Sequence, residues 1–279
     1  KPIVFLFGPT ASGKTELAIE LSKKFPVELV SVDSVMVYQD CDIGSAKPNK
    51  AILAEYPHHM VNIANLNSVF TVSNFCSVSH NLIKEIHSKD KLPIFVGGSM
   101  MYFKSLYEGL HRLPERDKDY RKELEILKVK NKPNFLYELL KNIDPTYAKK
   151  INKNDEIRII RALEIFKTTG EPLSKILLKE PKDSLLNQYQ VFQFGIHEER
   201  NKLHERIEYR LKEIFRMGLI EEVKSLLKKY DIAEDHPIRK SINYKQAFNY
   251  INGEYELETA FEKALFATRQ LCKRQITWF

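Results

Sequence analysis

Apolar and polar residues follow two alternating patterns in the first 110 residues of this chain. Apolar runs at 3–7, 27–32 and 92–96, with a shorter one at 58–61, alternate with helical periodicity such as that of 71–89. Uninterrupted apolar runs of this length are typical of strands buried on both faces, and the 3.6-residue period is typical of amphipathic helices. This part of the chain therefore predicts an α/β unit with a parallel sheet.

The alternation of strands and helices stops near residue 111 and resumes near residue 184. Within this interval helical periodicity covers three charged segments: 116–130, 134–142 and 156–169. A strand pattern returns at 189–196. Three further helical patterns follow it: 198–217, 219–229 and 260–275. We therefore expect a core formed by 1–110 and 184–279, interrupted by a helical insertion domain at 111–183.

The segment from Gly8 to Thr15 has the G-x-x-x-x-G-K-[ST] spacing of a phosphate-binding loop, or P-loop, and lies between the first apolar run and the first helical pattern. Its glycines let backbone N–H groups face phosphate oxygens, Lys14 adds positive charge, and Thr15 can hold Mg²⁺. The residues expected to bind phosphate are Gly8, Pro9, Thr10, Ala11, Ser12, Gly13, Lys14 and Thr15. The motif and the pattern together predict an α/β fold: a P-loop NTPase-like parallel sheet core with a helical insertion domain and a helical C-terminal region.

Polar residues follow two of the other predicted strands. Asp33 comes directly after 27–32, at the edge of the sheet where ligands bind in open α/β folds, so it suits a general base or a Mg²⁺ contact. An Asp at a strand end also commonly caps the next turn, and this alternative stays open. Glycines and Ser99 follow 92–96, where P-loop ATPases and GTPases usually have an acid for Mg²⁺. The usual hydrolase arrangement is therefore missing.

The composition is that of an ordinary globular protein, with 43% apolar and 29% charged residues. No apolar run approaches the ~20 residues of a membrane span, and no secretory leader pattern precedes the first strand, so we expect a cytoplasmic protein. Cys41, Cys76 and Cys272 are widely separated, which argues against a disulfide framework or a zinc site and favours reduced thiols. The net charge of +7 suits a polyanionic partner without establishing one.

Two basic segments could serve such a partner. Arg158 and Arg161 lie three residues apart on one face of the predicted helix at 156–169, although charges of this kind also occur on ordinary solvated faces. The segment 240–246, expected between helices, mixes basic, aromatic and amide side chains that suit stacking and phosphate contact. Alone, neither segment decides for nucleic acid.

Taken together, these segments resemble the bacterial type of tRNA dimethylallyltransferases, also called tRNA isopentenyltransferases. The resemblance covers nearly the whole chain, and its motifs occur in the order that the family has. Besides the P-loop, they are Asp33-Ser34 with Val37-Tyr38, Asp42 to Pro48, Gly97-Gly98-Ser99 with Tyr102, Asn154-Asp155 through Glu164, Tyr244-Lys245-Gln246, and Thr268 through Phe279.

The resemblance implies transfer of a dimethylallyl group from dimethylallyl diphosphate to N6 of the adenosine 3′ of certain tRNA anticodons. It implies Asp33 as the base, Ser99 near the reacting groups, Lys14 on the diphosphate, and Thr15 on a Mg²⁺ cofactor. It further implies that a monomer suffices and that the insertion grips the anticodon stem-loop. The residues that would contact tRNA are Asp33, Ser34, Val35, Met36, Arg121, Ile157, Arg158, Ile159, Ile160, Arg161, Lys240, Ser241, Ile242, Asn243, Tyr244 and Lys245.

Four positions depart from the family's usual pattern, one of which is Glu156, where Pro is frequent at the start of the insertion helix. Ser99 stands where Thr is usual and keeps a hydroxyl, and Met36 stands where Gln is common and lacks its amide. Asn243 stands where Gly is usual, and Asn tolerates left-handed backbone better than most residues. Two other functions remain open at this point. One is a P-loop small-molecule or nucleotide kinase, in which Asp33 would activate a hydroxyl; the other is a non-catalytic RNA-binding module, which leaves the P-loop unexplained.

Overall fold

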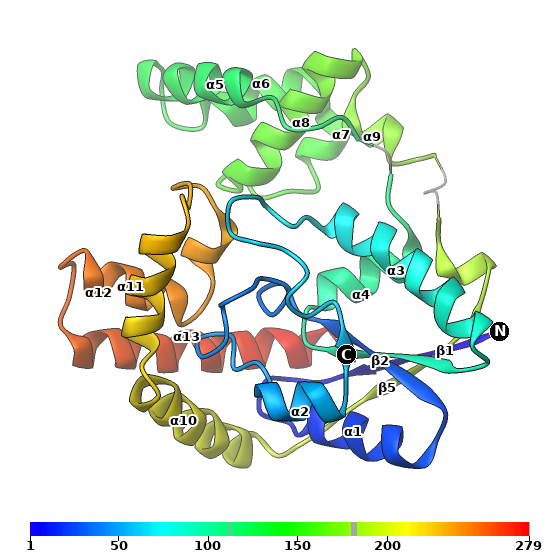
Figure 1. Cartoon of the computed structure of the whole chain (residues 1–279). Coiled ribbons are helices and arrows are strands. Elements are labelled where there is room, and N and C mark those ends of the chain that lie inside the picture. The colour runs from blue at the N-terminus through cyan, green and yellow to red at the C-terminus, as the bar shows by residue number, and fades with distance from the viewer. Residues whose placement is uncertain (112, 180–182, 279) are drawn as a thin grey trace. The chain divides into compact units, whose positions relative to one another are not determined.

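Five parallel strands form the sheet within the part of the chain described by this computed structural model, which comprises residues 1–111, 113–179 and 183–278 (Figure 1). Phe279 of the C-terminal motif thus lies outside the described residues. The strand order is β3-β2-β4-β1-β5. The strands are β1 Pro2–Phe7, β2 Val27–Val32, β3 His58–His59, β4 Leu92–Gly97 and β5 Gln190–Gly195. Each predicted strand is confirmed to within two residues at either end.

The chain divides into two compact units. Unit 1 comprises Lys1–Tyr107 and Leu185–Phe279 and contains the whole sheet. Unit 2 comprises Glu108–Ser184 and, in its described residues, consists of helices and their connections. The boundaries expected from the sequence differ from these by at most three residues.

The register of the sheet gathers three strand ends at one edge. Phe7, the last residue of β1, pairs with Gly97 of β4 and Gly195 of β5, while Val32 of β2 pairs with Gly97 from the other side. Because all four strands are parallel, the segments that follow β1, β2 and β4 leave the sheet side by side. The P-loop, Asp33 and the Gly98-containing turn therefore meet at the same edge.

Helices cover both faces of this sheet. Ala18 of α1 packs with Leu6 and Leu29 on one face, and Phe103 of α4 lies against Phe5 on the other, with ring centroids 5.0 Å apart. The apolar side chains of β1 alternate between the two faces, which explains why this strand reads as an uninterrupted apolar run. The helices of this part are α1 Lys14–Lys24, α2 Lys50–Glu55, α3 Val72–Ser88 and α4 Met100–Glu108.

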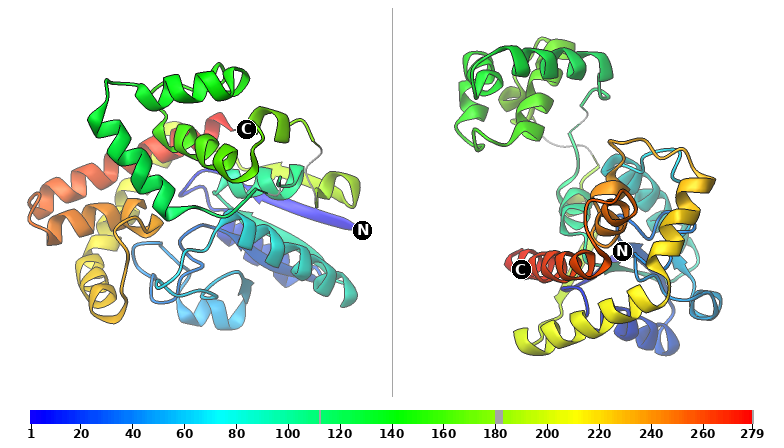
Figure 2. Two further views of the ribbon diagram at one scale, coloured as in Figure 1. Left: turned by 90° about the horizontal axis from the view of Figure 1, so that it is seen from above. Right: turned by 90° about the vertical axis from the view of Figure 1, so that its left-hand side faces the viewer.

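Four helices of the C-terminal region lie together in unit 1 (Figure 2). They are α10 Arg200–Arg216, α11 Leu219–Lys229, α12 Tyr244–Ile251 and α13 Leu257–Thr277, accompanied by the short 3₁₀ helices η1 Leu185–Asn187 and η2 Pro237–Lys240. The sequence predicted α10, α11 and α13 but placed 240–246 between helices. That expectation is wrong for its last three residues, because Tyr244, Ala247 and Phe248 have helical spacing and are buried in the first turns of α12.

Unit 2 has a hydrophobic core of its own, formed around Leu124, Leu140, Ile159 and Leu163. Its helices are α5 Lys118–Lys130, α6 Phe135–Ile143, α7 Pro145–Ala148, α8 Glu156–Thr169 and α9 Leu173–Ile176. Asp155 caps the N-terminus of α8, since its Oδ1 accepts a hydrogen bond of 3.2 Å from the backbone N–H of Arg158. Across the described residues of both units, no helix has the length and apolar character needed to cross a membrane.

Candidate active site

The P-loop connects β1 to α1 and curls through two residues with positive φ, Ala11 at 63° and Gly13 at 83°. A Cβ at Gly13 would meet nothing within 4 Å, so its backbone conformation, rather than a lack of space, favours glycine here. The Lys14 ammonium group donates a hydrogen bond of 3.0 Å to the carbonyl oxygen of Pro9. The Ser12 hydroxyl is buried and, among the described residues, has no hydrogen-bond partner. The loop thus has the shape and the free donor expected of an anion-binding loop.

A cavity of about 540 Å³ opens beside this loop, entirely within unit 1. Segments from the P-loop, the ends of β2 and β4, the loop after β2, helices α10 and α13, and the 240–243 segment all contribute to its wall. The predicted site residues that line it are Thr10, Lys14, Thr15, Asp33, Ser34, Val35, Met36, Ser99, Lys240, Ser241, Ile242 and Asn243. The fold therefore brings together in one cavity most of the residues that the sequence assigned to a site in the core.

Arg210 of α10 is a cavity residue that the sequence analysis missed. Its guanidinium Nη2 donates a hydrogen bond of 2.9 Å to the carbonyl oxygen of Ala46. Burial and the nearby Arg210 charge lower the pKa of Lys14 to about 8, and burial also lowers the pKa of Arg210. Two cations held close together in a buried site favour an anion between them. The signal was present in the sequence, because Arg210 interrupts the apolar stripe formed by Ile207, Leu211 and Ile214.

Asp33 is held in a fixed orientation at the end of β2. Its Oδ1 accepts hydrogen bonds from the backbone N–H groups of Val35, at 2.8 Å, and Met36, at 3.1 Å. The alternative of a turn-capping Asp is therefore confirmed, but the same carboxylate also lines the cavity. Both of these bonds use Oδ1, which leaves Oδ2 for a ligand. A carboxylate fixed in this way is suited to accept or orient a proton of a bound substrate.

Gln275 of α13 ties the P-loop to the turn after β4. Its Oε1 accepts a hydrogen bond of 2.9 Å from the backbone N–H of Thr10, and its Nε2 donates one of 2.9 Å to the carbonyl oxygen of Gly98. A Cβ at Gly98 would lie 2.3 Å from Nε2, so this close approach requires glycine. Ser99, which follows, begins α4 by accepting a backbone hydrogen bond of 2.8 Å from Tyr102. The Gln275 side chain thus fixes the P-loop relative to Ser99.

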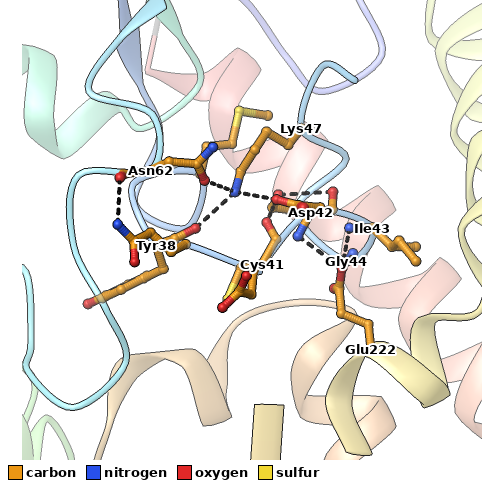
Figure 3. Close-up of polar contacts among 12 residues, drawn as sticks. Tyr38, Cys41, Asp42, Ile43, Gly44, Lys47, Asn62 and Glu222 are labelled. Carbon is orange, nitrogen blue, oxygen red and sulfur yellow. Dashed lines mark hydrogen bonds and ion pairs between the residues drawn. The ribbon is translucent and has the colours of Figure 1, made fainter. Parts of the chain in front are cut away.

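Two charged side chains hold the loop between Tyr38 and Lys47 (Figure 3). The ammonium group of Lys47 donates to the carbonyl oxygen of Tyr38, to Asp42 Oδ1 and to Asn62 Oδ1 at 2.6–2.9 Å, and its side chain is only 2% exposed. On the other side, the Glu222 carboxylate accepts hydrogen bonds from successive backbone N–H groups of this loop. This rigid loop forms part of the cavity wall.

Comparison with known proteins decides the family. The model of the IPP transferase family matches residues 36–279. The chain belongs to this family. It is 42% identical over 282 residues to a tRNA dimethylallyltransferase of Acinetobacter baumannii, covering 99% of this chain and 90% of that protein. A tRNA dimethylallyltransferase of Nitrosomonas eutropha is 40% identical over 276 residues, covering 99% of this chain and 86% of that protein.

Solved structures of IPP transferases agree with this assignment. The full-length tRNA isopentenylpyrophosphate transferase of Bacillus halodurans superposes with a TM-score of 0.69 at 34% identity, covering 100% of this chain and 86% of that one. A eukaryotic dimethylallyltransferase acting on tRNA gives a TM-score of 0.81 at 29% identity, covering 100% and 69%. The predicted fold class and family are thereby confirmed, and the comparisons favour the transferase over the kinase alternative.

Three of the four positions that depart from the usual IPP transferase pattern, Met36, Ser99 and Asn243, line the cavity, whereas Glu156 begins α8 in unit 2. Asn243 adopts a positive φ of 72°, as a Gly at this position could, and its Nδ2 donates a hydrogen bond of 2.8 Å to the carbonyl oxygen of Gly44. The predicted turn therefore persists. Met36 contacts the Ser31 hydroxyl through its sulfur at 3.9 Å, so a thioether lies where many relatives have an amide. Ser99 follows the end of β4 and lines the same cavity as the P-loop residues Thr10 and Lys14.

Two of the residues expected to contact tRNA need correction. The side chain of Tyr244 is buried, and its hydroxyl donates a hydrogen bond of 2.8 Å to Glu222. Ile159 is likewise buried, in the core of unit 2. Sequence reasoning assigned both from their motifs, but the helical period turns these two side chains inward. They support the neighbouring exposed residues instead of contacting a partner.

In unit 2, the two arginines of α8 have different surroundings. Arg158 has a 65% exposed side chain whose ion partner is Asp155, one turn away on the surface. Arg161 instead pairs with Glu164 and donates a hydrogen bond of 2.6 Å to the carbonyl oxygen of Pro114. The exposed members of the predicted set in this unit are Ile157 and Arg158, whereas Ile160 packs partly against the core. Arg158 therefore remains a candidate for tRNA contact, and Arg161 has a structural partner.

Glu164 organises this part of unit 2. Its side chain is 0% exposed and accepts hydrogen bonds from Arg121 Nε and Nη2, at 2.8 and 3.0 Å, and from the backbone N–H of Asp117 at 2.7 Å. Burial raises the pKa of this carboxyl, but the hydrogen bonds from Arg121, Arg161 and the Asp117 N–H outweigh it and lower the pKa to about 2. Arg121, another predicted tRNA contact, is thus held by a buried carboxylate, with 30% of its side chain exposed.

Proposed function

We propose that this chain transfers a dimethylallyl group from dimethylallyl diphosphate to the exocyclic N6 of the adenosine 3′ of the anticodon in tRNA. Membership of the IPP transferase family supports this reaction. The observation that carries it is the cavity in unit 1, whose wall contains the cations Lys14 and Arg210 together with the fixed carboxylate of Asp33. Apolar side chains such as Met100 and Leu271 complete the wall and suit a hydrocarbon group.

The positively charged residues of the cavity, Lys14 and Arg210, would stabilise the leaving group. The C–O bond of the donor breaks as the N6–C bond forms, so negative charge grows on the diphosphate oxygens. Lys14, Arg210 and the N–H groups of the P-loop are already in place to bind that charge, which lowers the barrier without reorganisation. Removing any one of these donors is expected to reduce the rate more than it weakens substrate binding.

The residues present also fit a Mg²⁺ ion, which the family resemblance implies as cofactor. Thr15 offers a hydroxyl and Asp33 a carboxylate at the cavity wall, and the described residues contain no cluster of three or more His, Cys, Asp or Glu side chains that could bind a metal. This sparse donor set matches Mg²⁺, which usually binds one or two protein groups together with water and phosphate oxygens. When bound, the ion would neutralise charge on the diphosphate.

On the acceptor side, Asp33 would accept or orient the proton that leaves N6 when the new bond forms. The target adenine has to leave its stack in the anticodon loop to enter a cavity of this kind, as bases do in other enzymes that modify them. Met36 and Asn243 line the same cavity and would lie close to the extruded nucleotide. Ser99 would contribute its hydroxyl near the reacting diphosphate.

We further propose that unit 2 grips the anticodon stem-loop, using exposed groups such as Arg158. The net charge of +7 supports binding to a polyanion. Lys14, Asp33, Ser99 and Arg210 all line this one cavity, and we propose that a monomer suffices for the reaction. We place the reaction in the cytoplasm, where the three cysteines, all free and buried in this structure, remain reduced.

The test is tRNA-dependent transfer. The protein is incubated with dimethylallyl diphosphate labelled in its five-carbon group, Mg²⁺ and unmodified tRNA, and the label that precipitates with RNA is counted. We expect incorporation only when donor, tRNA and active protein are all present. Consumption of ATP with a small acceptor, and no label on RNA, would overturn the proposal in favour of a kinase.

A further inference from the structure

Glu222 lies on α11, outside the cavity wall, yet its carboxylate binds the loop that forms part of that wall (Figure 3). Its Oε2 accepts hydrogen bonds from the backbone N–H groups of Asp42, at 2.9 Å, and Ile43, at 2.6 Å. Its Oε1 accepts from the N–H of Gly44 at 3.0 Å and from the Tyr244 hydroxyl at 2.8 Å. Four donors therefore converge on one carboxylate.

Only an ionised carboxylate satisfies this arrangement. It offers about four acceptor positions and no donor, which matches three N–H groups and one hydroxyl. A glutamine in its place would present its NH₂ group to donors and leave some of them without a partner. Successive backbone N–H groups that face one anion form a nest, and the nest fixes the conformation of the loop that carries them.

The fixed loop leads directly to the residue that contacts the guanidinium of Arg210. Two residues beyond Gly44, Ala46 has a φ of 52°, a left-handed conformation that is uncommon for a residue other than glycine. Its N–H donates a hydrogen bond of 2.9 Å to the carbonyl oxygen of Ile43 inside the nest. Its own carbonyl oxygen accepts the hydrogen bond of 2.9 Å from Arg210 Nη2. The position of the Arg210 guanidinium therefore depends on a turn that Glu222 holds.

We propose that Glu222 is a positioning residue for the transfer reaction, acting through Ala46 to hold the guanidinium of Arg210 in the cavity beside Lys14. This inference rests on the proposed function, because Arg210 matters there as a ligand of the departing diphosphate. Glu222 itself touches no substrate. Its effect is to keep a buried cation where charge develops, so that the site is organised before the donor arrives.

The test is a double-mutant cycle measured by steady-state transfer with dimethylallyl diphosphate and tRNA. The variants are Glu222→Gln, Arg210→Ala and the double variant. Glu221→Gln is the matched control, since Glu221 is the neighbouring residue, has a 73% exposed side chain and forms an ion pair with Lys224 on the surface. We expect Glu222→Gln to reduce kcat/KM for the donor by about tenfold with an unchanged KM for tRNA, and Glu221→Gln to behave as the wild type.

In the Arg210→Ala background, the same Glu222→Gln change should cost less than about threefold, because two residues that act as one unit are not additive. An equal loss in both backgrounds, or full activity of Glu222→Gln, would overturn the inference. If Glu222→Gln does not fold, Ala46→Val replaces it in the cycle, since a β-branched residue is strained at this φ and shifts the same carbonyl. A wild-type protein that transfers nothing would overturn the proposed function instead.

Discussion

Gln275 Nε2 lies 2.9 Å from the carbonyl oxygen of Gly98, so a side chain near the C-terminal end of the described chain holds the turn after β4. The same amide accepts a hydrogen bond from the N–H of Thr10 in the P-loop. An amide is the side chain that can donate to the first group and accept from the second. Gln275 thus adds a direct link between the P-loop and the turn that precedes Ser99, beyond the pairing of β1 with β4.

Gln275→Glu should lower kcat for transfer by about tenfold to a hundredfold. A carboxylate cannot donate to the Gly98 carbonyl, and its charge repels the diphosphate in the P-loop. Steady-state kinetics with both substrates measure the effect. Glu262→Gln, at an exposed position of the same helix α13, serves as the control and should retain wild-type kinetics. Unchanged kcat in Gln275→Glu would show that the P-loop and the β4 turn keep their places without this amide.

Asp33→Asn should reduce kcat by about 10²–10³-fold, the size expected for loss of a general base. The asparagine oxygen can still accept the hydrogen bonds from the N–H groups of Val35 and Met36, so the turn should survive. Affinity for tRNA, measured by filter binding, should change less than about threefold. Near-normal kcat in this variant would limit Asp33 to its turn-capping role.

The strands and the P-loop were predictable because their signals are local. A buried parallel strand is a short apolar run, and the P-loop motif specifies its own backbone between a strand and a helix. The roles of Arg210 and Glu222 were not predictable in this way. Arg210 meets Lys14 only when α10 folds back onto the sheet edge, and Glu222 binds backbone N–H groups that lie about 180 residues earlier in the chain. Apart from the break that Arg210 makes in the apolar stripe of α10, such contacts leave almost no trace in local pattern.

Some tRNA contacts predicted from motifs were wrong for the same reason, because contacts between distant segments decide which side chains are buried. The segment 240–246 was predicted to be a basic and aromatic connection between helices, whereas Tyr244 begins α12 and is buried. In α8 the spacing of Arg158 and Arg161 placed them on one face, but the buried Glu164 draws Arg161 inward. The burial of Glu164 depends on Arg121 and Asp117, which lie 43 and 47 residues earlier in the chain, and such contacts are not visible to a periodicity argument.

Glu164→Gln should lower the free energy of unfolding by about 3–5 kcal/mol at pH 7, because Arg121 and Arg161 lose their buried partner. The wild-type contribution also depends on pH. The folded pKa of about 2 lies below the unfolded value, so this stabilisation is complete above about pH 4.5 and is lost as the pH falls toward 2. Urea unfolding followed by circular dichroism at pH 7 and at pH 3 measures both effects.

The variant should therefore lose less stability than the wild type between pH 7 and pH 3. Glu123→Gln provides the comparison, since Glu123 pairs with Lys167 on the surface with 60% of its side chain exposed, and such pairs contribute little. Equal unfolding free energies for Glu164→Gln and Glu123→Gln would contradict the stabilising role of the buried carboxylate.

Arg158→Ala should weaken tRNA binding and reduce the salt dependence of the affinity by about one phosphate contact, with little change in stability. Arg161→Ala should show the opposite behaviour. It should lower the stability of the fold, while the tRNA affinity of the folded protein should change little. Filter binding over a series of salt concentrations, together with thermal melting, distinguishes the two. An Arg158→Ala variant with wild-type affinity at every salt concentration would return Arg158 to an ordinary solvated surface position.

In the proposed reaction, one cavity transfers the dimethylallyl group of an allylic diphosphate to a single adenosine of tRNA and releases the diphosphate. The most direct measurement compares two transcripts of one tRNA that differ only in having A or G immediately 3′ of the anticodon. Each is incubated with dimethylallyl diphosphate and Mg²⁺, digested to nucleosides and analysed by mass spectrometry. We expect N6-dimethylallyladenosine from the first transcript and no prenylated nucleoside from the second. Prenylation of both, or of neither, would contradict the proposed reaction.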